Sequence, residues 1–591
     1  MNLPFHSLKQ KYEPDDKDRT LEFCFKFELH LPDLVMKLKS ETIPSLSKFT
    51  CIMRAFVYLF LLTSLTVSGQ RNESPAIVVG IVVDQMKMEY LNRYYDKFSD
   101  GGFKKLMTEG FLFKNSHYNY IPTKTGPGHA SIYTGTSPSN HGVIANDWFA
   151  REKNLTINCV SDLSASAVGG SERNGKYSPK NLISSTITDE LRSFSNFRSK
   201  VVSVSIKNRG AILPGGHNPT GAYWMDTNTG DFMTSTYYRP QLPGWVNQLN
   251  ERKLVSNYLD ATWNTLQPIE NYTESSADDT EYERIFKGKE RPTFPHVLSE
   301  IVKLEGVGLI RETPFGNTLT LEMALAAIKG EQLGQDQFTD FLAVSFSSTD
   351  YVGHAFGPNS VEIEDTYLRL DLELARLLDY LDKNFSNNYQ IFLTSDHGVA
   401  NVPQFQIDNK LPGGYISAEN WKKDFEVKVN EVLGEGQWIL SISNNQIVLN
   451  RILVTQNRKN LTDVQQKVRE VALSMDHVEQ AYTSLEMEKR DGTDYYKVLL
   501  QNGFHSQRSG DILLKMSPGY LWDDWGRKGT THQSGNTNDT HVPIIFYGKN
   551  IAAGNSVRKV ATIDIAPTIS MLLDISLPSN ATGQPLYELF K

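Results

Sequence analysis

The stretch Ala76-Ile-Val-Val-Gly-Ile-Val-Val-Asp84 is a continuous apolar run that ends on a carboxylate. A short run of this kind is typical of a strand buried on both faces, as in the parallel sheets of α/β proteins. The runs 201–206, 341–346 and 390–394 have the same character. We therefore expect at least four strands in the core of one sheet.

Helical patterns lie between these runs. In 177–194, apolar residues recur on one face, with Ser178 as the predicted N-cap and Pro179 in the first turn. Ser360 is predicted to cap a longer helix that precedes the run 390–394. The alternation predicts an α/β fold in which helices cover both faces of a mostly parallel sheet.

Acidic and imidazole residues follow three of the predicted strands, namely Asp84, Asp350 with His354, and Asp396 with His397. Because parallel strands end at one edge of a sheet, these side chains are expected to converge there. Carboxylates and imidazoles suit zinc, and the spacing of Asp350 and His354 puts both on one side of a helical turn. Taken singly, Asp350 is explained equally well as a helix cap, and His397 as a solvated turn residue. Their recurrence at strand ends favours a metalloenzyme.

The segment Thr123-Lys-Thr-Gly-Pro-Gly-His-Ala-Ser131 places a hydroxyl before small residues and a predicted helix. The free N–H groups and the dipole of a helix N-terminus favour an anion there. Thr125 is therefore the candidate nucleophile. The alternative is that Thr125 only caps the helix.

Composition is that of a globular protein with a large core: 591 residues, 39% hydrophobic and 22% charged. The net charge of −8 argues against a polyanion-binding surface, so nucleic acid is not an expected partner.

Two regions break the alternation of strands and helices, at about 215–293 and 410–503, and are predicted to be insertions over the active edge of the sheet. The second contains strand-like pieces at 438–443 and 446–449 and an amphipathic helix around 461–474.

An export signal is predicted at 53–69. Met53-Arg54 precedes the apolar run 55–67, and the small residues Ser68 and Gly69 follow it. The run falls short of the ~20 residues of a membrane span, so a permanent anchor is the less favoured alternative. We expect Met53 to be the true start, with 1–52 an N-terminal extension. A catalytic domain at 70–591 would then be periplasmic or secreted, with Cys159 as its single cysteine and no internal disulfide.

Taken together, the order and spacing of the motifs resemble the alkaline phosphatase superfamily and, within it, the secreted phosphate monoesterases of the PafA type. The resemblance covers nearly all of the chain after the signal. The residues that carry it are Asp84, the Thr-Gly-Pro-Gly-His-Ala segment from Thr125, Asn146, Ser205 to Gly210, Ser348 to His354, Thr394 to Gly398, His532, Thr540 to Pro543 and Ile563 to Thr568.

The resemblance implies two zinc ions per chain. One would be held by Asp350, His354 and His532, and the other by Asp84, Asp396 and His397 together with the Thr125 oxygen. The family usually has glycine after the last histidine, whereas this chain has Gln533. His541 is the rival ligand, although its setting is more typical of a supporting residue.

The resemblance also implies hydrolysis of small phosphate monoesters to an alcohol and inorganic phosphate through a covalent phosphothreonine. A strand ending at Ile206 would aim Lys207 and Arg209 to the same side, where they could hold the oxygens of a doubly charged phosphate. Asn146 would add an amide hydrogen bond. Related nucleotide pyrophosphatases/phosphodiesterases lack the cationic pair. The alternative for Lys207 and Arg209 is that they are a solvated pair of charges at the start of a loop. The alternative for Asn146 is that it is only a turn residue.

Three alternatives remain. A phosphodiesterase of the same superfamily would share the metals. A sulfatase would need a cysteine or serine in a Cys/Ser-x-Pro-x-Arg pattern, against which Thr125-Gly-Pro-Gly-His129 counts strongly. A non-catalytic phosphate-binding protein would need no nucleophile.

Overall fold

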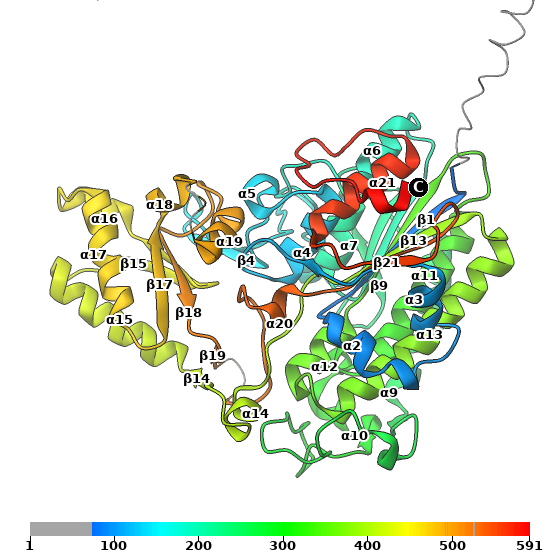
Figure 1. The fold of residues 1–591 in the computed structure, drawn as a ribbon, viewed down its shortest axis with the longest axis horizontal. Coiled ribbons are helices and arrows are strands. Elements are labelled where there is room, and N and C mark those ends of the chain that lie inside the picture. Colours follow the sequence, from blue (N-terminus) through cyan, green and yellow to red (C-terminus); the bar gives the residue numbers. More distant parts are fainter. Residues whose placement is uncertain (1–73, 491, 493, 524–525, 591) are drawn as a thin grey trace, which may run out of the picture. The chain divides into compact units, whose positions relative to one another are not determined.

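The computed structural model describes residues 74–490, 492, 494–523 and 526–590 (Figure 1). The predicted extension at 1–52 and the predicted signal at 53–69 lie outside these residues. In the described part of the chain, no helix is both long enough and apolar enough to cross a membrane.

A ten-stranded sheet organises the fold. Its core runs β13-β1-β12-β7-β8 and is entirely parallel, which confirms the predicted mostly parallel α/β sheet. Antiparallel pairs flank this core on both sides, between β13 and β20 and between β8 and β9. In spatial order the strands are β21 (Gly554–Ser556), β2 (Phe111–Phe113), β20 (Ile544–Gly548), β13 (Tyr389–Thr394), β1 (Ile77–Val83), β12 (Asp340–Phe346), β7 (Val201–Ser205), β8 (Gly221–Met225), β9 (Phe232–Ser235) and β6 (Ala167–Val168).

The central strand β1 is buried along its whole length because helices cover both faces of the sheet. Successive side chains of a strand point to opposite faces, and those of β1 enter two different hydrophobic clusters. Ile77, Val79, Ile81 and Val83 pack with α11 (Phe315–Gly330) and α13 (Val361–Phe385). Val78 and Val82 pack with α4 (Thr125–Thr134) and α21 (Ile565–Leu573). This double cover explains the unbroken apolar run in the sequence.

Of the two helices that were predicted from Ser178 and Ser360 as N-caps, one is confirmed and the other is wrong in part. Ser360 caps α13 as predicted, since its hydroxyl accepts from the N–H of Ile363. The helix predicted at 177–194 is wrong in its first half, because α6 spans only Ile187–Phe194 and is capped by Thr186. The Ser178 hydroxyl instead donates to the Asp162 carboxylate, so it stabilises a loop and not a helix end.

A second, four-stranded sheet lies within the second predicted insertion and just beyond it (yellow to orange in Figure 1). Its order is β15 (Ile439–Ser443), β16 (Gln446–Leu449), β18 (Ile512–Met516) and β17 (Val478–Thr483). With α15 (Ala418–Leu433) and α17 (Leu461–Leu473) it forms its own hydrophobic cluster. The predicted strands and amphipathic helix are therefore confirmed, whereas the insertion boundaries remain a prediction.

Candidate active site

The carboxyl edge of the parallel core carries the predicted site. Asp84 follows β1, Lys207 follows β7, Asp350 follows β12, and Asp396 with His397 follows β13. All five residues are buried. The expected convergence therefore occurs, because each parallel strand ends at this edge.

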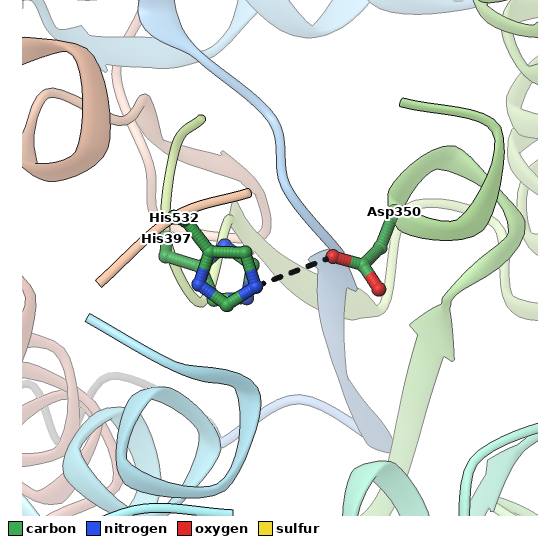
Figure 2. Close-up of side chains that lie close together, drawn as sticks. All are labelled: Asp350, His397 and His532. Carbon is green, nitrogen blue, oxygen red and sulfur yellow. Dashed lines mark ion pairs between the residues drawn. The ribbon is translucent and has the colours of Figure 1, made fainter. Parts of the chain in front are cut away.

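Two groups of buried side chains could each hold a metal ion. One consists of Asp350, His397 and His532, and the other of Asp84, Asp396 and His397. Figure 2 shows the first group, with Asp350 facing the rings of His397 and His532, whose centroids are 3.5 Å apart. His397 belongs to both groups, so the two candidate metal positions adjoin one another.

His354 lies beside the first group rather than in it. It is on α12 (Ser348–Phe356), four residues after Asp350, and its Nε2 is 3.2 Å from Asp350 Oδ1. The helix explains why the Asp350–His354 spacing brings the two side chains together. The resemblance pairs His354 with Asp350 and His532, and the ring centroids of the two histidines are 5.1 Å apart.

The tautomers of the three histidines follow from their outer contacts. Each Nδ1 lies at hydrogen-bonding distance from a backbone carbonyl oxygen: His354 from Thr530 (2.7 Å), His397 from Gly398 (2.9 Å) and His532 from Thr123 (2.6 Å). A carbonyl oxygen only accepts, so each Nδ1 carries a proton. In a neutral ring the other nitrogen, Nε2, then carries a lone pair directed into the site.

The lone pairs of His397 and His532 face carboxylate oxygens. His397 Nε2 is 3.5 Å from Asp84 Oδ1 and 3.6 Å from Asp396 Oδ2, and His532 Nε2 is 3.7 Å from Asp350 Oδ1. Burial lowers the pKa of both His397 and His532, which favours neutral rings. Two of these oxygens, Asp84 Oδ1 and Asp396 Oδ2, are buried without a hydrogen-bond partner. A cation between the nitrogen and oxygen donors would satisfy both, so the donor set fits zinc.

Thr125 is the first residue of α4 and is buried. Lys124, and not Thr125, occupies the N-cap position, so the alternative role of Thr125 as the cap is not observed. Its Oγ1 lies 3.4 Å from His397 Nε2. The following turn packs tightly on the site, since a Cβ at Gly128 would lie 2.2 Å from the carbonyl oxygen of Asp396. The small residues of this segment therefore allow the helix to approach the strand end.

Asn146 lies beside Thr125. Its Oδ1 accepts a hydrogen bond of 2.7 Å from the N–H of Gly126, the residue after Thr125. This contact fixes the orientation of the amide and leaves its NH₂ group as a donor for a ligand.

Lys207 and Arg209 reach the site in a different way from the one predicted. β7 ends at Ser205, Lys207 is the N-cap of α7 (Asn208–Gly215), and Arg209 lies in the first turn of that helix. The strand-alternation argument for their common direction was therefore wrong, because the chain has already turned into a helix.

The Lys207 ammonium pairs with two predicted metal ligands. Its Nζ is 2.7 Å from Asp84 Oδ2 and 2.5 Å from Asp350 Oδ2, and it lies 4.8 Å from the centroid of the Tyr351 ring. Burial raises the pKa of Asp84, and the neighbouring Asp350 carboxylate raises it further. Each carboxylate thus gives one oxygen to Lys207 and turns the other towards a histidine. The Nε of Arg209 is buried without a hydrogen-bond partner, which leaves this guanidinium a donor for an anion.

Sequence reasoning missed two residues that position the predicted ligands. Gln85 has φ +66°, donates its backbone N–H to Asp396 and its side-chain amide to Asp350. His129 bridges the Thr125 carbonyl oxygen and the Ser345 hydroxyl, with its Nδ1 3.3 Å from Asp396 Oδ2. Gln85 follows Asp84 and His129 lies within the quoted Thr125 segment, but neither has a pattern of its own that predicts these partners.

His541, the rival ligand, lies elsewhere. Its ring stacks on His117 with centroids 4.6 Å apart, and its Nε2 is 2.9 Å from the carbonyl oxygen of Lys114. It is in neither of the two candidate metal groups found among the described residues.

A mostly parallel sheet whose carboxyl edge carries a buried threonine, carboxylates and imidazoles defines a hydrolase of the alkaline phosphatase superfamily. The family model described as type I phosphodiesterase / nucleotide pyrophosphatase matches residues 78–540, and the chain belongs to this family.

Its relatives include alkaline phosphatases. PafA of Elizabethkingia meningoseptica is 45% identical over 87% of this chain and 94% of its own length. PhoV of Synechococcus elongatus is 43% identical over 88% of this chain and 93% of its own length. A protein of Myroides odoratus named as a calcium-transporting ATPase is 44% identical over 88% of this chain and 96% of its own length.

The crystal structure of wild-type PafA covers 87% of this chain and 99% of its own, with a TM-score of 0.84 and 44% identity. With such relatives, the chain is an alkaline phosphatase of the PafA type, as the motifs predicted.

Proposed function

We propose that the chain hydrolyses phosphate monoesters at a two-zinc centre, with Thr125 as the nucleophile and a covalent phosphothreonine as the intermediate. The observation that carries this proposal is the set of imidazole lone pairs and unpartnered carboxylate oxygens around the Thr125 hydroxyl. Asp84, Asp396 and His397 would hold one ion, and Asp350, His354 and His532 the other. When bound, the zinc ions would supply Lewis acidity to the attacking and leaving oxygens.

The reaction has two steps. Thr125 loses its hydroxyl proton as its Oγ1 attacks phosphorus, the bond to the ester oxygen breaks, and this oxygen takes up a proton and leaves as the alcohol. Water then attacks the phosphothreonine, which releases inorganic phosphate and restores the hydroxyl. The N-terminus of α4 favours negative charge at this position.

Three side chains would bind the transferring phosphoryl oxygens. Lys207 and Arg209 supply positive charge and hydrogen bonds, and Asn146 supplies its free NH₂ group. Lys207 lies between Asp84 and Asp350. It would neutralise the carboxylates in the absence of substrate and the phosphoryl oxygens when substrate is bound.

Phosphodiester hydrolysis is the second candidate, because the matching family model is described by that activity. A diester lacks the second charged oxygen that Lys207 and Arg209 would bind. A diester would therefore gain less from these two cations than a monoester would, so the pair favours monoesters.

A panel of substrates tests the proposal. With zinc-loaded protein, we expect the highest kcat/KM for a phosphate monoester, and lower values for a matched diester and a sulfate ester. ATP belongs in the panel as well, because the terminal phosphoryl group resembles that of a monoester and one relative carries an ATPase name. Faster diester than monoester turnover would replace the proposal by the second candidate.

Export of the mature protein is a further part of this proposal. We expect the exported form to begin near Gln70, since Ser68 and Gly69 follow the apolar run. Intact-mass analysis of protein from the periplasm or the medium measures this directly. Retention of Met1 in that species would contradict both the start at Met53 and the signal.

A further inference from the structure

Three buried serines lie at the carboxyl ends of β7 and β12. Ser205 of β7 and Ser345 of β12 are partners in the parallel register, so their side chains leave the sheet on the same face. Ser347 follows β12 directly. Each of these serines is at most 1% exposed. A hydroxyl buried to this degree is costly unless it is hydrogen-bonded, so the partners of the three serines indicate their role.

The three hydroxyls are linked to one another and to Lys207. The N–H of Lys207 donates to Ser205 Oγ at 3.1 Å. Ser205 Oγ lies 3.2 Å from Ser347 Oγ, which lies 3.3 Å from Ser345 Oγ. Ser347 is the N-cap residue of α12, but its hydroxyl does not cap that helix. The Ser347 hydroxyl instead joins the serines of two neighbouring strands.

His129 connects these serines with the proposed nucleophile. It lies in α4, four residues after Thr125, and is fully buried. Its Nε2 is 2.9 Å from Ser345 Oγ, and its Nδ1 is 2.9 Å from the carbonyl oxygen of Thr125. Together, the three serines and His129 form a serine–histidine network. The network joins the backbone of the nucleophile to that of the cation Lys207.

The hydrogen bonds of the serine–histidine network have one consistent direction. A carbonyl oxygen only accepts, so His129 donates from Nδ1, and Nε2 of the neutral ring accepts from the Ser345 hydroxyl. A serine has one hydroxyl hydrogen, so Ser345 accepts from Ser347, and Ser347 accepts from Ser205. Each hydroxyl therefore donates once and accepts once. Removal of one member leaves its neighbours without a partner.

The first turn of α7 packs closely on the network. A Cβ at Gly210 would lie 2.7 Å from Ser205 Oγ and 3.0 Å from Ser345 Oγ. The absence of a side chain at Gly210 therefore lets the helix that carries Arg209 approach the two hydroxyls. Both cations of the proposed phosphate site are thus placed by the network, Lys207 through a hydrogen bond and Arg209 through the packing of its helix.

We propose that the serine–histidine network sets the position of the two cations relative to the nucleophile, and that Ser345 is a positioning residue for phosphoryl transfer. Thr125 Oγ1 would attack the same phosphoryl group whose oxygens Lys207 and Arg209 bind, so the reaction depends on the separation of the two sides. Ser345 is the link between them, because it joins the serines to His129 of α4. The inference rests on the proposed monoesterase function and adds a residue outside the proposed substrate and metal contacts.

Ser345→Ala tests the inference on a monoester and a diester with the same leaving group, with zinc-loaded protein. The monoester preference is the ratio of kcat/KM for the monoester to that for the diester. Because the cations are proposed to serve the monoester more, we expect Ser345→Ala to lower this preference about three- to tenfold. An unchanged preference would overturn the inference. Faster diester than monoester turnover by the parent would instead overturn the proposed monoesterase function.

A second background separates positioning from general support of the fold. In a protein that already carries Lys207→Ala and Arg209→Ala, the network has no cation to position. Ser345→Ala should then change the monoester preference by less than about twofold. A fall as large as that in the parent, or an equal loss of kcat/KM on both esters in the parent, would show that Ser345 only supports the structure and would overturn the inference.

Ser131→Ala is the matched control. Ser131 belongs to another buried serine–histidine pair of α4, since its Oγ is 2.9 Å from His141 Nε2. Loss of the Ser131 hydroxyl also leaves a buried imidazole nitrogen without its partner, so both variants should unfold at a lower temperature. Only Ser345→Ala should lower the monoester preference. An equal fall of this preference in Ser131→Ala would show a general response to a lost buried hydrogen bond and would overturn the inference.

Discussion

Thr125→Ala is expected to lose at least about a thousandfold in kcat for phosphate monoesters, as removal of an attacking oxygen does in other hydrolases. The methyl side chain of alanine cannot form the phosphoryl bond, and water must attack the substrate directly. Thr125→Ser keeps an oxygen at the helix N-terminus and should retain far more activity. Single-turnover assays that trap phosphorylated protein should give a labelled Thr125 peptide in the parent and none in the alanine variant.

Zinc removal should have an effect of similar size. Chelation is expected to abolish turnover and added zinc to restore it, because the buried imidazole nitrogens and carboxylate oxygens that surround Thr125 form the two candidate metal groups. Metal content has to be measured for each variant, since the Thr125 oxygen is itself a predicted ligand.

Thr134→Ala is the matched control for Thr125→Ala. Thr134 is another buried threonine of α4, and its hydroxyl donates to the carbonyl oxygen of Ala130 within the same helix. Near-normal turnover by Thr125→Ala, with zinc bound and the fold intact, would show that Thr125 is not the nucleophile.

Lys207→Ala and Arg209→Ala are each expected to lower kcat/KM for a monoester roughly ten- to more than a hundredfold, since charge-assisted hydrogen bonds contribute about 1.5–3 kcal/mol. Diester hydrolysis should fall much less, because a second ester group covers the oxygen that these cations would bind. The measurement is the ratio of kcat/KM for a monoester and a diester with the same leaving group.

Lys207 requires an additional control because it pairs with Asp84 and Asp350. Its removal leaves two buried carboxylates without their cation, which destabilises the metal-free protein and alters metal affinity. Zinc content and unfolding temperature distinguish this effect from a lost phosphate contact. Lys105→Ala, which breaks the pair with Asp382 outside the site, should change neither ratio nor metal content. Equal losses on both esters would mean that Lys207 and Arg209 only support the structure.

The strands and their terminal acids could be predicted because both signals are local. An unbroken apolar run such as β1 requires cover on two faces, and parallel strands have one carboxyl edge. Asp84, Asp350, Asp396 and His397 were therefore expected to meet, although they lie far apart in the chain. The contact between Asp350 and His354 could also be predicted, because residues four apart lie on the same face of a helix such as α12.

Competition between local contacts limited other predictions. Ser178 has the character of a helix cap, but a carboxylate distant in the loop, Asp162, takes its hydroxyl. Lys207 and Arg209 were expected to project from a strand, but the chain turns at Ser205 and they begin a helix instead. Three or four residues are too few for hydrophobic periodicity to distinguish a helix cap from a loop contact, or the end of a strand from the start of a helix.

The sequence by itself determined the α/β class, the edge of the sheet that carries the chemistry and the residue types gathered there, because these depend on strand burial and strand direction. Only the tertiary structure decided the contacts across that edge, namely Gln85 and His129 against the acids and Lys207 between two carboxylates. Such contacts join segments more than a hundred residues apart, and their geometry depends on how the helices pack against the strands.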